Sequence, residues 1–387
     1  SSGGFSLIEL VIAMGLFVAV AAAALGLLKP GHGVFAVQSE VADMQQRARA
    51  AFEALSRDLA ETGGGPMRGR GGPLSFALPA VLPLRLGPRG GDRPGTVRPD
   101  TMTVLAVPQG AAQATVDQPT PARSGTVAIR LEPGCPLGDP ACGFREDMDV
   151  LLHDGTGAFE TFVVTGVTAS TLTLAHTTDD WPKVYPAGSA LVQVDSRTYF
   201  LRGGQPARPP QLLRYGGGFH SDVPVVDHVV GLSFEYFGEP DPPTMVRPLS
   251  DPNGPWTTYG PPPPLDPAAA PPGPASSCLF LANGTPLASP RLPFLGSPGG
   301  PLVPLTPAQL GDGPMCPDAG APTSFDADVL RIRSVGVRLR VQAALAALRG
   351  PAGALFAQGG TARSGDRFAP DIELHFRVTP RNLVLGR

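Results

Sequence analysis

The chain has 387 residues, a formal net charge of −3 and only 16% charged residues. Binding to nucleic-acid phosphates needs clustered Lys and Arg, so this composition argues against a nucleic-acid partner. With 49 Gly and 47 Pro, part of the chain is expected to be irregular, while a hydrophobic share of 42% is sufficient for a core.

The first predicted element is an apolar helix over 5–28, in which Glu9 is the single charged residue. A helix of this length rises about 36 Å, enough to cross the hydrocarbon layer of a membrane. A cleaved secretory signal would have a shorter apolar core. A plain anchor would not carry an acid one turn in, because an ionisable group there costs about 2.5–3.5 kcal/mol. Glu9 is therefore a candidate functional residue that needs a cationic partner.

The sequence GFSLIEL at 4–10 resembles the class III signal of type IV pilins and type II secretion pseudopilins. The resemblance implies that a prepilin peptidase in the membrane cuts between Gly4 and Phe5 and methylates the new amine of Phe5. Residues 1–4 are then a leader remnant, although the family's leader is usually basic before the glycine. The amine of Phe5, from the same chain or a neighbour, would pair with Glu9 in a medium of low dielectric. The resemblance thus makes Glu9 an assembly residue.

Helical periodicity continues over 29–62, behind an interruption at Pro30 and Gly31. Apolar residues there, Phe52 among them, recur at three- and four-residue steps until the pattern stops at TGGGP (62–66). One long helix is predicted, with its front half in lipid and its rear half packed on a head. Pro30 and Gly31 predict a kink between the halves. The family resemblance implies that this region loses helicity when subunits pack into a filament.

Short β-type runs separated by turn residues fill most of 63–237 and predict a β-rich head containing a β-meander or barrel-like module. The runs that lead to this expectation are 101–107, 126–131, 149–152, 159–167, 171–174, 190–194 and 197–201. A further run at 225–238 alternates apolar and polar residues, which predicts a half-buried strand.

In 238–322, 35 of 85 residues are Gly or Pro, which excludes a helix or a sheet interior. A surface excursion is predicted there, and both a disordered spacer and an ordered, partner-facing loop remain open. In 323–387, strands return at 329–341 and 371–380, with a helical or turn-like segment at 343–349. The predicted fold class is α+β: a long N-terminal transmembrane helix followed by an antiparallel β-rich globular head with long Pro/Gly-rich loops.

The order of the four cysteines suggests the disulfides Cys135–Cys142 and Cys278–Cys316, although four cysteines allow three connectivities. Free buried thiols remain an alternative, and the spacing fits no zinc module. Disulfides would place the head in an oxidising compartment.

No residue pattern indicates catalysis. The histidines are scattered over turns and strands without the spacing of metal ligands, and neither a G-x-S-x-G motif nor an activated cysteine is present. Asp147 with Asp149, and Asp179 with Asp180, offer loop carboxylates suited to calcium, although turns explain such pairs more simply. We therefore predict no enzyme, no cofactor and no metal.

Four later segments extend the resemblance to minor pilins of the PilW and PulJ type: ALSRDLAETGGGP, VVGLSFEYF, IRSVGVRLRV and VTPRNL. The resemblance implies a pilin-like fold, a single span of the inner membrane and a periplasmic head. It also implies partners: other minor pilins, the major pilin, the inner-membrane assembly platform and a large tip adhesin. The function implied is priming of type IV pilus assembly, with the subunit at the pilus tip on the cell surface.

Two alternatives remain. The first is a minor pseudopilin of the J type at the pseudopilus tip of a type II secretion system. The second is a membrane-tethered binding protein that uses its head alone, for which Glu9 would be dispensable.

Overall fold

The computed structural model describes residues 6–63, 79–87, 90–108, 110–121, 125–130, 138–139, 141–153, 159–175, 184–204, 208–218, 220–243, 279, 281–282, 285–286, 291–316, 324–363 and 367–384. Within these ranges, only the backbone is described at 25–34, 159, 281–282 and 285–286.

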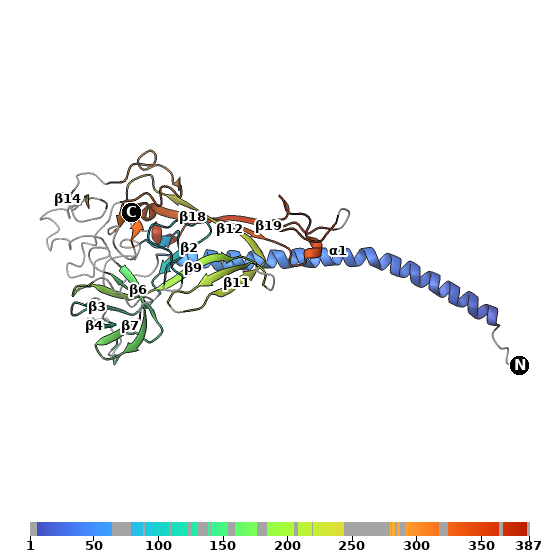
Figure 1. The fold of residues 1–387 in the computed structure, drawn as a ribbon, viewed down its shortest axis with the longest axis horizontal. Coiled ribbons are helices and arrows are strands. Elements are labelled where there is room, and N and C mark those ends of the chain that lie inside the picture. Colours follow the sequence, from blue (N-terminus) through green and yellow to red (C-terminus); the bar gives the residue numbers. More distant parts are fainter. Residues whose placement is uncertain are drawn as a thin grey trace.

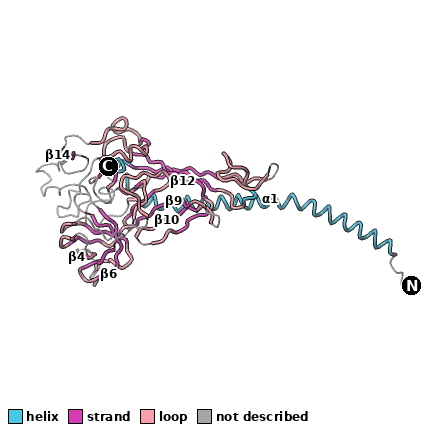
Figure 2. The backbone as a smooth tube through the Cα atoms, in the orientation of Figure 1, coloured by secondary structure: helices cyan, strands magenta, loops and turns pink. Residues whose placement is uncertain are grey.

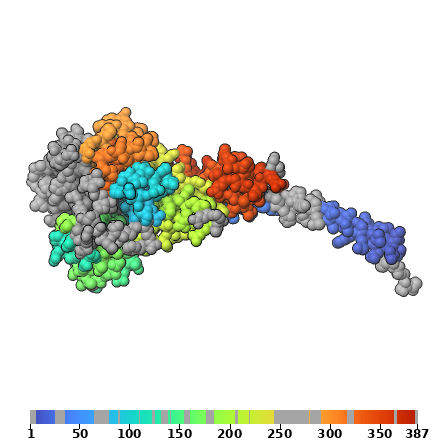
Figure 3. Space-filling view, viewed as in Figure 1, coloured from blue at the N-terminus to red at the C-terminus, as the bar shows by residue number. Residues whose placement is uncertain are grey.

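The N-terminal helix α1 (Leu7–Glu61) is one element of 55 residues that projects from a β-rich head (Figure 1). Its window Leu7–Ala24 has a mean hydropathy of 2.5 and is long and apolar enough to cross a membrane. None of that window is buried inside the molecule, and in Figure 3 the blue N-terminal segment extends clear of the head.

The helix is continuous through Pro30 and Gly31, and it curves gently toward the N-terminus in Figure 1. No helical break occurs at these two residues, and the kink that they predict stays a prediction. The helix ends where predicted: the hydroxyl of Thr62 donates to the carbonyl of Asp58, and Gly63 follows with a φ of 68° that favours glycine.

The second half of α1 buries one face between two antiparallel sheets. Its fully or almost fully buried residues recur at helical spacing: Met44, Ala48, Ala51, Leu55 and Leu59. On one side the helix contacts β2 (Met102–Ala106) and β11 (Val223–Asp227), and on the other β18 (Ile332–Val341) and β19 (Ile372–Val378). The helix and both sheets therefore share one hydrophobic core.

The strands gather at one end of the helix (Figure 2). A five-stranded sheet has the order β1 (Val81–Leu82), β2, β9 (Asp195–Arg202), β10 (Gln211–Tyr215), β11. A four-stranded sheet has the order β15 (Val303–Leu305), β12 (Val229–Gly238), β18, β19. Two small two-stranded ladders pair β13 (Leu281–Ala282) with β14 (Thr285–Pro286) and β16 (Met315–Cys316) with β17 (Phe325–Asp326).

A closed six-stranded barrel is inserted between β2 and β9, which confirms a barrel in the region where a meander or barrel was predicted. The strands follow the order β3 (Gln113–Val116), β4 (Thr126–Arg130), β7 (Thr171–Ala175), β6 (Phe159–Val167), β5 (Asp149–His153), β8 (Ala190–Gln193). Its interior forms a core separate from that of the helix and sheets. The barrel is thus a unit with a core of its own.

The half-buried alternation predicted over 225–238 is confirmed in β12, where Leu232, Phe234 and Tyr236 are buried, but the prediction of a single strand there is wrong. Strand β11 ends at Asp227 and strand β12 begins at Val229, and His228 between them has a φ of 60°. A left-handed residue turns the chain sharply, so β11 stays in the five-stranded sheet while β12 enters the four-stranded sheet. The turn at His228 links the two sheets around α1.

The strand predicted from Val329 begins three residues later. Ala327–Arg331 forms the 3-10 helix η3, capped by the carboxylate of Asp326, and β18 follows. The predicted alternation in β18 holds for Val335, Val337, Leu339 and Val341, which are fully or almost fully buried.

Part of the Pro/Gly-rich region 238–322 is ordered. Val303–Leu305 joins β12 as an edge strand, the position in a sheet that tolerates Pro304. Leu279, Leu292 and Leu310 are buried in the main core. For residues 291–316 the structure therefore favours an ordered loop over a disordered spacer.

Candidate functional site

The helix N-terminus places Glu9 in a capping box with Ser6. The backbone N–H of Ser6 donates to Oε2 of Glu9 at 3.0 Å, and the hydroxyl of Ser6 accepts from the N–H of Ile8. Gly4 and Phe5 lie outside the described residues, and the cleavage, methylation and charge pair stay predictions. The S-x-x-E pattern of residues 6–9 is itself the sequence signature of this cap. Glu9 therefore has a local structural role as part of the helix cap, and its assembly role stays a prediction.

The apolar window of α1 presents large side chains to its surroundings on all sides. Leu7 is 80% exposed and Phe17 is 74% exposed. An exposed apolar surface of this extent requires lipid or neighbouring protein to cover it. Glu9 lies near the start of that surface.

A buried polar cluster fixes the C-terminal end of α1 to the five-stranded sheet. Asp58, of which 3% is exposed, accepts hydrogen bonds from the hydroxyl of Tyr199 at 2.5 Å and from Arg197 at 2.7 Å. Arg197 also pairs with Glu61 and with Asp195, both at 2.9 Å. Burial and the neighbouring charge of Asp58 raise the pKa of Tyr199 above its usual range, so this hydroxyl remains a donor.

A second contact holds the C-terminal region against the middle of α1. The buried carboxylate of Glu40 accepts from the backbone N–H of Ala344 at 2.6 Å and lies 3.5 Å from Arg47. His228 faces the same region, and burial together with the positive charge of Arg47 lowers its pKa. The segment after β18 is thus attached where α1 leaves the head.

Arg331 joins the start of the Pro/Gly-rich region to a segment in its interior. Its side chain is fully buried, pairs with Asp328, and donates to the carbonyls of Pro240 at 2.9 Å, Asp241 at 2.8 Å and Pro293 at 2.6 Å. One guanidinium therefore ties together segments separated by about fifty residues of sequence. No sequence pattern signalled this role, because the acceptors are backbone carbonyls.

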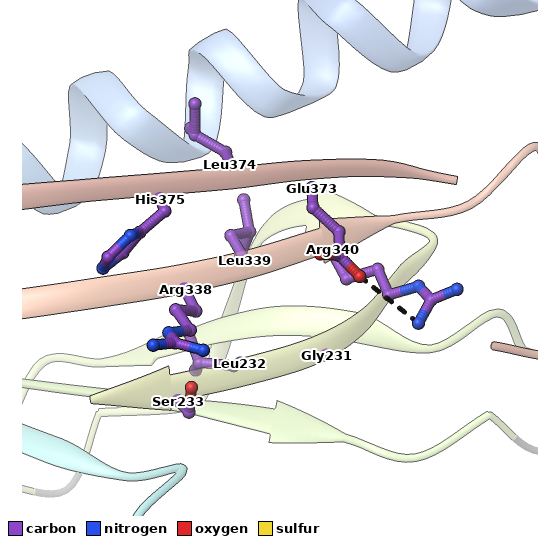
Figure 4. A pocket seen from close by; sticks show the side chains of 9 residues that line it. All are labelled: Gly231, Leu232, Ser233, Arg338, Leu339, Arg340, Glu373, Leu374 and His375. Carbon is purple, nitrogen blue, oxygen red and sulfur yellow. Dashed lines mark ion pairs between the residues drawn. The ribbon is translucent and has the colours of Figure 1, made fainter. Parts of the chain in front are cut away.

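A groove of about 510 Å³ lies on the outer face of the four-stranded sheet (Figure 4). The register places the small residues Gly231 and Ser233 beside Arg340 and Arg338, which leaves the space open. Arg340 pairs with Glu373 at 3.4 Å, as the dashed line in Figure 4 marks. Arg340 also pairs with Asp371, and Arg338 with Glu235. Because both guanidinium groups are already paired, the groove is poorly suited to a small anion.

Among the acidic residues considered for calcium, Asp147 and Asp149 lie in the described part of the chain. Asp179 and Asp180 lie outside the described residues. Asp149 is mostly buried at the base of the barrel, where burial and the charge of Asp195 raise its pKa to about 7, and His220 lies 4.0 Å away. In the part of the chain that is described, neither Asp147 nor Asp149 belongs to a three-ligand cluster.

Another acidic cluster was missed because its members come from two segments. Carboxylate oxygens of Asp312, Asp326 and Asp328 lie within 4.8 Å of one another. Asp326 already accepts from the backbone N–H groups of Gly313 and Asp328, and Asp328 pairs with Arg331. These bonds serve the turn and η3, which accounts for the cluster without an ion.

Cys142 and Cys316 are both disulfide-bonded, and no free cysteine occurs among the described residues. Cys135 and Cys278 lie outside the described residues, so the predicted pairing stays a prediction.

The chain was compared with protein-family models and with curated proteins. No protein-family model matches the chain, and no curated protein matches it. The structure itself establishes an α+β protein in which one N-terminal apolar helix precedes an antiparallel β-rich region with a six-stranded barrel.

Proposed function

We propose that this chain is a minor subunit of a type IV pilus, held in the inner membrane by α1 before assembly. In this proposal it joins other minor subunits in a complex that primes the filament and supports an adhesin at its tip. The head lies in the periplasm before assembly and at the cell surface afterwards. No catalytic role is proposed.

One observation carries the proposal: a single acid, Glu9, lies near the start of an exposed apolar window on a helix whose other half is packed into the head. A carboxylate at this depth is costly unless a cation meets it. The amine produced by cleavage before Phe5 would supply that cation, and the GFSLIEL motif at 4–10 supports such processing.

Glu9→Gln is the decisive variant because glutamine keeps the acceptor for the capping box and removes the charge. If Glu9 acts through its charge, the variant is expected to be expressed and inserted into the membrane normally. It should, however, be absent from filaments sheared from the cell surface. Immunoblots of membrane and filament fractions from the native host measure both quantities. Filaments that contain the Glu9→Gln variant at the wild-type level would show that Glu9 is only a helix cap.

Ser6→Ala is the matched control. It removes the hydroxyl of the cap and leaves the carboxylate of Glu9 in place, so filament incorporation should be close to wild type. Mass spectrometry of the mature N-terminus gives an independent reading, since a methylated Phe5 is expected. Retention of Gly4 in filament material would contradict the proposal. Loss of protein secretion with normal pili on deletion would assign the chain to a secretion pseudopilus instead.

A further inference from the structure

The strand β19 forms the open edge of the four-stranded sheet. Its seven residues pair with β18 in an unshifted register from Ile372↔Val341 to Val378↔Val335. No described residue hydrogen-bonds to the other edge of β19. An unpaired edge of this length is a template for another strand.

The other sheet edges are protected in ways that β19 is not. β1 has two residues, β15 has three and contains Pro304, and β11 contains Pro224. Short length and proline are the usual means by which proteins block strand addition. β19 contains neither proline nor glycine, and its register with β18 has no bulge.

The apolar side of β19 is left incompletely covered. The inner-face residues of β18 are at most 1% exposed, whereas the equivalent residues of β19 are only partly buried. Beside them, Phe52 of α1 is 39% exposed and meets Phe376 edge to face, with ring centroids 4.8 Å apart. A strand added to β19 would cover Phe52 and Phe376 while pairing the open edge.

The outer face of β19 specifies the charge of such a strand. Glu373, His375 and Arg377 are exposed there and alternate with the apolar residues. Glu373 also pairs with Arg340, and the guanidinium of Arg377 lies over the ring of Phe237. An antiparallel neighbour would place an acid opposite Arg377 and a base opposite Glu373, because opposite charges in cross-strand pairs are favourable and like charges are not. The neighbour therefore carries an acid, then a base four residues later, with apolar residues between them.

We propose that β19 is a docking edge for an extended segment of another protein, which adds antiparallel to it as a fifth strand. The sequence of β19 itself, IELHFRV, has the required charge order, so a second copy of the chain satisfies the same charge rule. However, β19 runs in the same direction as α1, since Phe376 meets Phe52 and Asn382 reaches the carbonyl of Glu61. A two-fold pair would point the two α1 helices in opposite directions, which excludes two chains anchored in one membrane. The exclusion of a second copy rests on the membrane anchor of the proposed function, whereas the docking edge itself stands whether or not the chain enters a pilus.

The probe is a synthetic fluorescent peptide of sequence DIELHFRVT, N-methylated along one edge so that it cannot stack on itself. Its binding to the full chain in detergent micelles is followed by fluorescence anisotropy. The charge-swapped peptide DIRLHFEVT, methylated in the same way, is expected to bind about tenfold more weakly because it places like charges opposite Glu373 and Arg377. A peptide methylated on both edges should not bind.

The matched protein variant carries Glu373→Arg and Arg377→Glu together and should reverse the preference between the two peptides. Its circular dichroism and melting temperature verify the fold, because the exchange also removes the Glu373–Arg340 pair and the contact of Arg377 with Phe237. Absence of binding at up to about 1 mM peptide, or a preference that does not reverse, would overturn the docking edge. Wild-type chains that dimerise with one another through β19 in micelles, but do not form mixed dimers with the charge-swapped variant, would overturn the choice of a different protein as partner.

Discussion

The hydroxyl of Tyr199 donates a 2.5 Å hydrogen bond to the carboxylate of Asp58, joining the five-stranded sheet to the last turns of α1. Both side chains are almost fully excluded from solvent. Arg197 and Arg214 flank the same carboxylate, at 2.7 and 3.6 Å. These bonds fix the last turns of α1 to the five-stranded sheet.

Tyr199→Phe is expected to lower the free energy of unfolding by about 1–3 kcal/mol, because Asp58 loses a buried donor. Tyr236→Phe is the matched control. The Tyr236 hydroxyl is buried without a hydrogen-bond partner in the described part of the molecule, so its removal should be neutral or stabilising. Denaturant unfolding of the purified chains in detergent measures both, and equal losses would contradict a specific role for the Asp58 bond.

Replacing Glu40 with Ala should release the segment after β18 from α1. The Ala344 N–H then loses its acceptor and Arg47 loses a buried partner, at a cost of about 1–3 kcal/mol. Hydrogen exchange at Ala344 is expected to accelerate, whereas exchange in β2 should not. Asp43→Ala, which removes an exposed partner of Arg47, should change stability by less than about 1 kcal/mol. Unchanged protection of Ala344 would refute this contact.

Arg331→Met should destabilise the head by about 3–5 kcal/mol, because the buried Asp328 loses its counterion. The double variant with Asp328→Leu should recover part of that loss, since it removes the orphaned charge. Arg338→Met is the surface control and should cost less than about 1 kcal/mol, because its side chain is 61% exposed. A double variant no more stable than the single one would show that the bonds to backbone carbonyls dominate.

The free energy of unfolding of the barrel, which contains Asp149 in β5, is expected to fall as the pH rises from about 4 to about 7. The pKa of Asp149 is raised to about 7 by burial and by Asp195, so the folded chain keeps a proton that the unfolded chain loses in this window. Asp149→Asn should therefore be more stable than wild type at pH 8, by about 2–4 kcal/mol, and closer to it at pH 4. Urea unfolding at both pH values measures this, and a difference independent of pH would exclude the titration of Asp149.

Asp195→Asn should move the same transition to lower pH, because the charge of Asp195 contributes to the raised pKa of Asp149. The partial ion pair of His220 with Asp149 is retained in this variant. A transition at the wild-type pH would show that burial accounts for the whole shift.

Local patterns predicted the elements well where they depend on neighbours in sequence. The period of buried residues in α1, its end at Thr62 and Gly63, and the alternation of Val335 with its neighbours all follow from side chains a few positions apart. The S-x-x-E cap at Ser6 is equally local, although it was not predicted. By contrast, His228 has no local signal for a left-handed residue, so the change of sheet there could not be foreseen.

The candidate sites also divide into those that depend on neighbouring residues in the sequence and those that depend on tertiary contacts. The amino-acid sequence by itself determined an exposed apolar helix with one acid at Glu9, because hydropathy and charge belong to each residue and need no fold to be read. Only the tertiary structure decided that Asp58 meets Tyr199, that Arg331 holds three distant carbonyls and that β19 lies at an open edge. These relations join segments far apart in the chain, and their positions depend on how two sheets pack around one helix.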